Sequence, residues 1–285
     1  MFAFIRDLLE LGKSSITIMV VMTTAAGFVL GQSSVMPWQR LLWVVVGTAF
    51  ISGGASVFNH YVEREVDKLM PRTANRPLPA GRLSPKLAMA YGSWLTVVGV
   101  VLLGMLDRTV MVLGLIAWAS YLFVYTPLKR RSWLATLAGT VPGALPPMMG
   151  WVAATDQLSA GGWILFGLLF CWQMPHSYAI AWLCRDQYQA AGMPLLSVGD
   201  LGGKRTATQT LGFTAALVLV SLTPVMFDLG GIAYTVGAAL LGGWFLRLAW
   251  TFAREVSNPN ARKLMLYSVA YLPAVLLLLV VDRLI

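Results

Sequence analysis

The sequence predicts an all-α, polytopic membrane protein with nine transmembrane helices in a bundle. Of its 285 residues, 58% are hydrophobic and 12% are charged, whereas a soluble domain carries about 25% charged residues. Apolar runs of about 20 residues, the length that crosses a bilayer as a helix, recur along the whole chain. Lys and Arg concentrate in alternate connecting segments, which is typical of a chain that crosses a membrane repeatedly.

Each span is expected where an apolar run lies between polar or Gly/Pro-rich segments. The first run is expected to be a retained helix and not a signal peptide, because it lacks a small-residue cleavage site and further runs follow. Short connections, such as the one at 107–109, require neighbouring helices to pack as antiparallel hairpins. The expected spans are 15–30, 41–58, 86–106, 110–125, 134–153, 162–183, 208–227, 230–251 and 264–281.

The distribution of positive charge predicts the orientation. If the N-terminus is cytoplasmic and the C-terminus periplasmic, the cytoplasmic segments are 1–14, 59–85, 126–133, 184–207 and 252–263. Of the 21 Lys and Arg residues, only Arg40, Arg108 and Arg283 then lie away from these segments and the helix ends beside them. This positive-inside pattern accounts for the net charge of +9 without a nucleic-acid partner.

A Gly- and Pro-rich stretch, 139–150, lies within the fifth expected span. Such residues loosen the hydrogen bonding of a membrane helix, so their clustering needs a structural reason. Two explanations stay open: close helix packing through small residues, and a kinked wall that leaves room for a bulky ligand.

The stretch 59–79 at the end of the second expected span holds three carboxylates and several cations. Asn59, Glu63 and Asp67 recur every four residues, so successive members drift by only about 40° around a helix and share one face. Glu65 projects to another side and is expected to be solvated. Ionisable groups at the membrane edge are costly to keep without a role. Oxygen ligands of this kind suit Mg²⁺.

Cations follow directly after this row of carboxylates. Lys68, Arg72 and Arg76 suit phosphate oxygens, and a divalent cation that bridges the carboxylates to a diphosphate would explain both signs of charge. In the turn at 126–133, Lys129 and Arg130 are either a topology signal alone or further diphosphate contacts.

The second long cytoplasmic segment, 184–207, supplies Asp186 as the acid expected to face the first cluster. Both long cytoplasmic segments carry acids followed by a Pro-Leu pair, Pro77-Leu78 and Pro194-Leu195, which suggests two related halves that face each other.

Two histidines complete the candidates. His176 lies deep in the sixth expected span, where a neutral imidazole either ligates iron, acts as a base or packs with a hydrogen bond. His60 lies beside Asn59, and its role is equally open.

Three segments resemble the protohaem IX farnesyltransferases (haem O synthases), a branch of the UbiA-type intramembrane prenyltransferase superfamily. The row from Asn59 to Leu78 is similar to the superfamily's first motif, except that Glu63 stands where Asp is usual. The segments YTPLKRRSWLATLAGTVPGALPPMMGW and WQMPHSYAIAWLCRDQYQAAGMPLLSV, at 125–151 and 172–198, resemble the haem branch. The second of these lacks the full pair of spaced aspartates of the wider superfamily, so only Asp186 is carried over.

The resemblance implies one integral-membrane prenyltransferase domain over residues 1–285, with a central cavity that opens near the cytoplasmic face of the bacterial inner membrane. It implies transfer of a farnesyl group from farnesyl diphosphate to a vinyl group of haem b, giving haem O for terminal oxidases. Mg²⁺ is the implied cofactor, and haem-modifying or oxidase-assembly proteins are implied partners. The implied metal ligands and catalytic residues are Asn59, Glu63, Asp67 and Asp186, with Lys68, Arg72, Arg76, Lys129 and Arg130 on the diphosphate and His176 or His60 near the haem.

Two rival functions stay open. One is a prenyltransferase that acts on an aromatic or quinone-precursor acceptor. The other is an ion-coupled transporter, although transporters place their sites near the bilayer midplane and these acids lie at helix ends.

Overall fold

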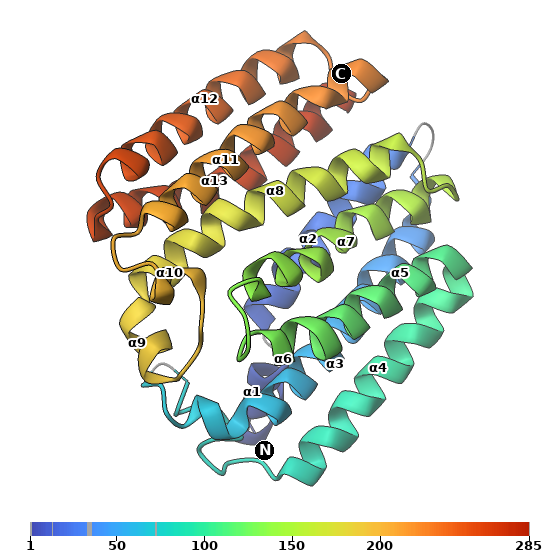
Figure 1. Cartoon of the computed structure of the whole chain (residues 1–285). Helices are drawn as coiled ribbons and strands as arrows, with labels where there is room; N and C mark the ends of the chain where they lie inside the picture. The colour runs from blue at the N-terminus through green and yellow to red at the C-terminus, as the bar shows by residue number, and fades with distance from the viewer. Residues whose placement is uncertain (1, 13, 33–35, 72, 285) are drawn as a thin grey trace.

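The computed structural model describes residues 2–12, 14–32, 36–71 and 73–284, and every regular element in these ranges is helical. The prediction of an all-α fold is therefore confirmed. Figure 1 shows the long helices side by side in one bundle, with α1 and the end of α13 at opposite ends of it. The elements are α1 (Phe2–Leu11), α2 (Ser14–Gly31), α3 (Trp38–Asp67), α4 (Pro85–Leu106), α5 (Arg108–Ala119), the π-helical turn η1 (Ser120–Tyr125), α6 (Thr126–Leu128), α7 (Ala135–Thr155), α8 (Ala160–Leu183), α9 (Arg185–Ala190), α10 (Leu196–Gly199), α11 (Lys204–Leu222), the 3₁₀ turn η2 (Thr223–Phe227), α12 (Ile232–Arg254) and α13 (Asn258–Leu284).

Helices occupy all nine ranges in which spans are predicted, but not all of them qualify by length and composition. In the described part of the chain, 7 helices are long and apolar enough to cross a membrane, and the pair α1 and α2, bent by 58°, raises the number to 8 if it forms one span. The helix α7 is not among them, because its three prolines and its glycines and threonines lower its hydropathy. The protein is an integral membrane protein, and the number of nine spans stays a prediction.

Close contact between α2 and α7 explains part of the Gly/Pro-rich stretch. A Cβ added to Gly150 would lie 1.9 Å from the carbonyl oxygen of Thr24, and one added to Gly27 would lie 2.0 Å from that of Pro147. The two backbones therefore approach more closely than any side chain allows, as in other membrane helix pairs. Pro142 and Pro146 instead line a cavity, and the kinked wall expected there stays a prediction.

The helices α2 and α7 also join the two largest apolar clusters of the bundle. One cluster contains Leu30 and Trp151 together with buried residues of α8, α11, α12 and α13. The other contains Phe28 and Met148 together with buried residues of α3, α4 and α5. Because α2 and α7 contribute to both, the packing is continuous through the bundle.

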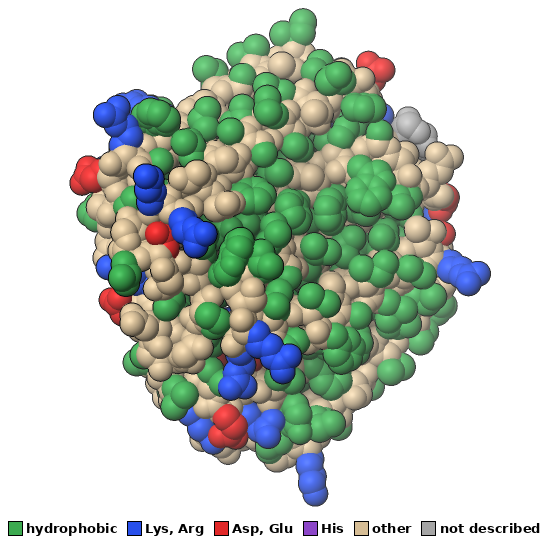
Figure 2. All heavy atoms as spheres, viewed as in Figure 1, with side chains coloured by type: hydrophobic (Ala, Val, Ile, Leu, Met, Phe, Trp, Pro, Cys, Tyr) green, Lys and Arg blue, Asp and Glu red, His purple; other side chains and the backbone are tan. Residues whose placement is uncertain are grey.

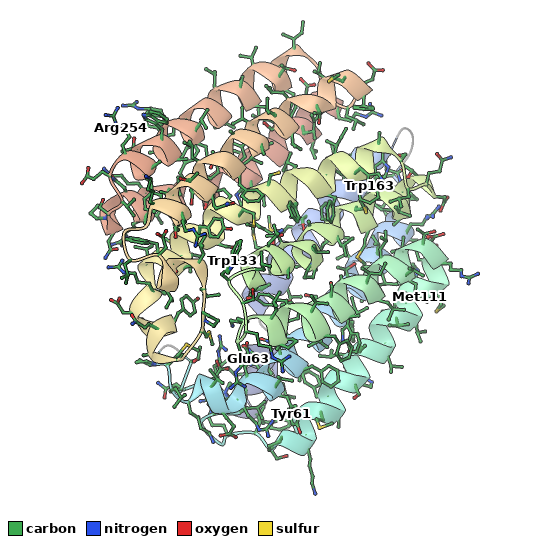
Figure 3. All side chains as sticks on the ribbon, in the orientation of Figure 1. Tyr61, Glu63, Met111, Trp133, Trp163 and Arg254 are labelled. Carbon is green, nitrogen blue, oxygen red and sulfur yellow. The ribbon has the colours of Figure 1, made fainter. Side chains whose placement is uncertain are left out.

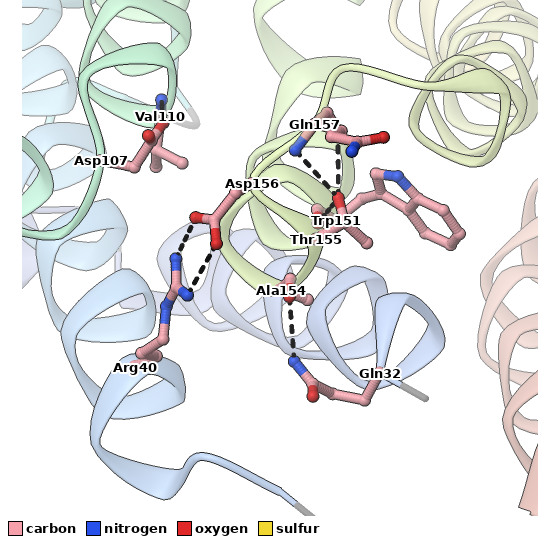
Figure 4. Close-up of polar contacts among 9 residues, drawn as sticks. All are labelled: Gln32, Arg40, Asp107, Val110, Trp151, Ala154, Thr155, Asp156 and Gln157. Carbon is pink, nitrogen blue, oxygen red and sulfur yellow. Dashed lines mark hydrogen bonds and ion pairs between the residues drawn. The ribbon is translucent and has the colours of Figure 1, made fainter. Parts of the chain in front are cut away.

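An ion pair fixes the end of the bundle at which α3 begins and α7 ends (Figure 4). Both terminal nitrogens of the Arg40 guanidinium donate to the Asp156 carboxylate, and this hydrogen bonding lowers the pKa of Asp156. Asp156 adopts a left-handed conformation with φ of 56°, which Asp tolerates better than most residues. Beside the pair, Gln32 donates to the carbonyl of Ala154 over 3.4 Å.

The surface has the character of a membrane protein. Figure 2 shows hydrophobic side chains across the middle of the visible face, with Lys and Arg gathered mainly along its left and lower edges, where Figure 1 places α9, α10 and the start of α4. Positive charge therefore gathers at one end of the helix axes.

Candidate functional site

The polar site begins where α3 continues beyond the expected end of its span. Asn59, Glu63 and Asp67 are all buried, with 1%, 4% and 1% of their surface exposed, whereas 65% of the Glu65 side chain is exposed. The fourfold spacing therefore places the three residues on one inward face, as predicted, and Glu65 faces solvent and pairs with Lys68. Figure 3 labels Glu63 on this part of α3.

Each buried carboxylate of the site is paired with one cation. Lys129 Nζ lies 3.1 Å from Glu63 Oε1, and Arg76 Nη1 lies 2.8 Å from Asp67 Oδ2. The hydroxyl of Thr73 donates to the backbone carbonyl of Asp67 over 2.8 Å and holds the segment that carries Arg76 against the end of α3. Burying a charge is costly unless it is paired, so these pairs stabilise the buried row.

Lys129 is held in an enclosed environment at the end of α6. Burial alone would lower its pKa, but the nearby Tyr125, Glu63 and Tyr121 outweigh that effect and raise the pKa above its ordinary value. Its ammonium also lies 5.9 Å from the centre of the Tyr125 ring. The side chain therefore stays protonated throughout the physiological range and presents a fixed positive charge.

A π-helical turn positions a residue that the sequence reasoning did not single out. Thr126 follows η1 and is buried; its hydroxyl accepts from Asn59 Nδ2 over 3.2 Å and donates to the Tyr121 carbonyl over 2.8 Å. Such π-helical insertions often mark functional sites. The sequence offered no distinctive signal for Thr126.

A cavity of about 420 Å³ adjoins this polar cluster. At one end it is bordered by Asn59, Lys129, Tyr121 and Tyr125, and the remainder of its wall is mainly apolar. Gln173 projects into the wall, where its amide donates to the Thr140 carbonyl over 3.3 Å. The cavity is bordered by side chains of α2, α3, α5, η1, α7 and α8, including Val20, Ile51, Ala55, Trp118, Pro142, Pro146, Met149, Ser177 and Ile180.

The residues predicted from the second long segment are arranged differently from the expectation. Asp186 lies on α9 with 90% of its side chain exposed, 3.7 Å from the guanidinium of Arg185, while Tyr188 of the same helix borders the cavity. Within the described ranges, no three His, Cys, Asp or Glu residues are grouped to hold a metal ion. A four-ligand site with Asp186 is therefore not assembled here, because each buried carboxylate is turned towards a cation and Asp186 projects away from the core.

Of the other predicted diphosphate contacts, Arg130 is exposed in the same turn as Lys129, and Arg72 lies outside the described residues. His60 is buried next to Asn59.

His176 is not among the residues that border the cavity; it lies about 60° around α8 from Gln173, which does. Its Nδ1 is 2.7 Å from the Ser268 hydroxyl of α13, and its ring stacks on Trp172 with centroids 5.2 Å apart. Because Ser268 donates its own proton to the Met265 carbonyl, Nδ1 must carry the proton that this contact requires. Nε2 therefore keeps a free electron pair.

Comparisons with known proteins show which proteins this chain is similar to. A family model described as the UbiA prenyltransferase family matches residues 20–270. The chain is 41% identical to a protoheme IX farnesyltransferase of Solibacter usitatus, over 98% of this chain and 99% of that protein. It is 43% identical to a protoheme IX farnesyltransferase of Salinibacter ruber, over 97% and 98% of the two chains.

Solved structures share the fold at low sequence identity. A digeranylgeranylglyceryl phosphate synthase superposes with a TM-score of 0.84 at 17% identity and covers 98% of each chain. A UbiA homolog from Archaeoglobus fulgidus bound to GPP and Mg²⁺ gives a TM-score of 0.66 at 15% identity, covering 96% of this chain and 99% of that one.

Proposed function

This chain belongs to the UbiA prenyltransferase family, and on that basis we propose that it transfers the farnesyl group of farnesyl diphosphate to a vinyl group of haem b, forming haem O. The observation that carries the proposal is the buried contact of Glu63 with Lys129, whose side chain borders the polar end of a mainly apolar cavity. Asp67 pairs with Arg76 one turn further along α3. The choice of a farnesyl donor and a haem acceptor rests on the high-coverage relatives, which are named protoheme IX farnesyltransferase.

The donor set fits a hard divalent cation. Asn59, Glu63 and Asp67 offer amide and carboxylate oxygens from one helix face, and Mg²⁺ prefers oxygen ligands and completes its shell with water and phosphate oxygens. When bound, Mg²⁺ would neutralise charge on the diphosphate as it leaves. We propose these three residues as its protein ligands, with Asp186 joining them if α9 turns inward.

We propose that Lys129 and Arg76 bind the diphosphate, with Lys68, Arg72 and Arg130 at the rim. Glu63 holds Lys129 and Asp67 holds Arg76, so both cations would be in place to meet a diphosphate. Cations aimed at the leaving group favour heterolysis of the bond between the farnesyl C1 and the diphosphate oxygen, and preorganised charge of this kind commonly contributes more to catalysis than any other single effect.

The apolar wall then protects the allylic cation from bulk water. The terminal vinyl carbon of haem b attacks C1 to form the new carbon–carbon bond, which leaves the positive charge on the vinyl carbon next to the porphyrin ring. A single water molecule adds its oxygen there and releases a proton. The products are haem O and diphosphate, and the water accounts for the hydroxyl group.

For the haem we propose His176 as the first candidate iron ligand and His60 as the second. The tautomer of His176 leaves Nε2 with the electron pair that iron binds. His176→Ala should shift the Soret band of haem bound to the purified protein, whereas His60→Ala should not. An unchanged band in the first variant would remove His176 from the haem site.

We propose that the whole chain is one domain of nine spans in the bacterial inner membrane. The end that carries Lys129 and Glu63 then faces the cytoplasm, the cavity opens there, and the C-terminus is periplasmic. The gathering of Lys and Arg at this end supports the orientation, and the packing of α7 against α2 and α8 supports counting α7 as a span. Haem-modifying or oxidase-assembly proteins are the partners expected for such an enzyme.

The test is incubation of the purified enzyme and Mg²⁺ with labelled farnesyl diphosphate and either haem b or a phenolic quinone precursor. Label should appear in a pigment with the mass of haem O and not in the phenol. Product on the phenol alone would assign the enzyme to the aromatic branch of the family, and pigment analysis of cells that overproduce the chain gives an independent reading.

A further inference from the structure

A second cleft, of about 300 Å³, lies outside the catalytic cavity, at the same end of the bundle as Lys129. It is formed where the turn before α7 meets α10 and the first turns of α11, and Figure 3 labels Trp133 at this junction. The residues that line it are Trp133, Leu196, Lys204, Arg205, Thr208 and Gln209. None of them has a role in the proposed reaction.

The cleft carries positive charge that is not neutralised within the described part of the protein. Lys204 and Arg205 are both exposed and make none of the ion pairs found among the described residues. The nearest acid in sequence is Asp200, but one oxygen of its carboxylate accepts from both the backbone N–H and the hydroxyl of Thr206. The cleft therefore offers two cations and the amide of Gln209 to an anionic ligand.

Exposed apolar side chains flank this charge. Trp133 is 47% exposed, and Leu201, in the loop before α11, is 94% exposed. An exposed leucine and tryptophan beside Lys and Arg, at the end of a membrane-spanning helix, are the composition of the lipid headgroup region, where Trp anchors and cations reach towards phosphates. A soluble anion would use the two cations but would leave Leu201 in water.

We infer that this cleft binds the phosphate of an anionic phospholipid, with Lys204 and Arg205 on the phosphate and Trp133 and Leu201 against the start of the acyl chains. The bound lipid bridges the two halves of the bundle, because Trp133 belongs to the turn after α6 and the cations belong to α11. The same turn begins with Lys129, and Ser132 N–H donates to the Leu128 carbonyl over 2.8 Å. Lipid at this site therefore steadies the segment that holds the inner cation of the catalytic site.

The test measures binding and does not depend on the proposed reaction. Full-length protein purified in detergent is titrated with dioleoyl phosphatidylglycerol or dioleoyl phosphatidylcholine, and the retained lipid is counted by native mass spectrometry. A Lys or Arg near anionic lipid contributes about fivefold in affinity. The double variant Lys204→Gln/Arg205→Gln should therefore retain phosphatidylglycerol about 30-fold more weakly, and phosphatidylcholine should be retained weakly by every variant.

The chain offers a matched control at the same end of the bundle. Arg262 and Lys263 are also adjacent, exposed and in the first turns of a long helix, but they line no described cleft. Arg262→Gln/Lys263→Gln should leave phosphatidylglycerol retention unchanged. Equal losses of phosphatidylglycerol retention in the two double variants would show that net charge alone causes the effect, and would overturn the proposed site. Displacement of the lipid by millimolar inorganic phosphate would assign the cleft to soluble anions and overturn the lipid assignment.

Discussion

Exchange of Asp67 for Asn, compared with Glu65→Gln, tests the proposed site most directly. Both changes remove one negative charge from α3 at nearly constant side-chain volume, two residues apart. The Asp67 carboxylate is 1% exposed and 2.8 Å from Arg76, whereas the Glu65 side chain is 65% exposed and pairs with Lys68. If Asp67 holds the cation that stabilises the departing diphosphate, its loss should lower kcat by about 10²- to 10³-fold, the usual effect of one missing electrostatic stabiliser. Glu65→Gln should leave kcat within about twofold.

The assay is haem O formation under saturating farnesyl diphosphate and Mg²⁺, followed by pigment chromatography. Stability must be measured in parallel, because Asp67 is buried and its loss removes the partner of Arg76. An isosteric exchange that leaves a hydrogen-bonded charge unmatched costs about 1–3 kcal/mol, so Asp67→Asn should unfold at lower temperature in detergent but stay folded at the assay temperature. A folded Asp67→Asn enzyme with kcat within threefold of wild type would refute the assignment, and so would an equal loss in Glu65→Gln.

Three further predictions concern packing, substrate binding and pH. Gly150→Ala should lower the free energy of unfolding by about 1–3 kcal/mol, because its new Cβ would lie 1.9 Å from a backbone oxygen of α2. Gly243→Ala should leave it unchanged, because nothing lies within 4 Å of the added Cβ. Thermal unfolding in detergent compares the two variants, and equal stability would contradict the close packing of α2 and α7. Lys129→Met should raise the Kd for farnesyl diphosphate about 10- to 100-fold, while Arg131→Gln in the same turn should change it little. Isothermal titration measures both, and an unchanged Kd in the Lys129 variant would show that Lys129 does not bind the diphosphate. The pKa of Asp156 is depressed by its arginine partner, so the stability it contributes is present above the unfolded pKa of about 4 and is lost as pH falls through the folded value. Since the Asp156 side chain is 58% exposed, Asp156→Asn should lower the free energy of unfolding by at most about 1 kcal/mol at pH 6 and by less at pH 3. A larger loss at pH 3 than at pH 6 would contradict this prediction.

Periodicity and charge were sufficient to predict the helices and the face shared by Asn59, Glu63 and Asp67. These features depend on residues close together in sequence, where the geometry of a helix fixes direction. The burial of Glu63 and the exposure of Glu65 follow from the same register. The class of the fold could be predicted for a similar reason, because a bilayer leaves few alternatives to helices for a chain of this composition.

The ion pairs could not be predicted in this way. Lys129 and Glu63 are 66 positions apart in the sequence, and their contact depends on how α6 packs against α3. Thr126 escaped notice because a buried threonine at a helix end has no distinctive sequence pattern. Asp186 was expected to face the carboxylates by analogy between the two long segments, but on the short helix α9 it is exposed to solvent. Tyr188 and Leu195 of the same segment border the cavity instead.

The charges of the inner site explain why diphosphate and a divalent cation should enter together. Glu63 and Asp67 carry two negative charges and their partners Lys129 and Arg76 two positive charges, so these four side chains are together neutral. A diphosphate that draws both cations towards itself leaves two buried carboxylates without partners, which is strongly unfavourable at low exposure. A divalent cation would match the charge of the two freed carboxylates, while Lys129 and Arg76 would neutralise part of the diphosphate. The two carboxylates that pair with cations are therefore also the ones proposed as metal ligands, and they can serve in both ways because they lie on one buried face of α3.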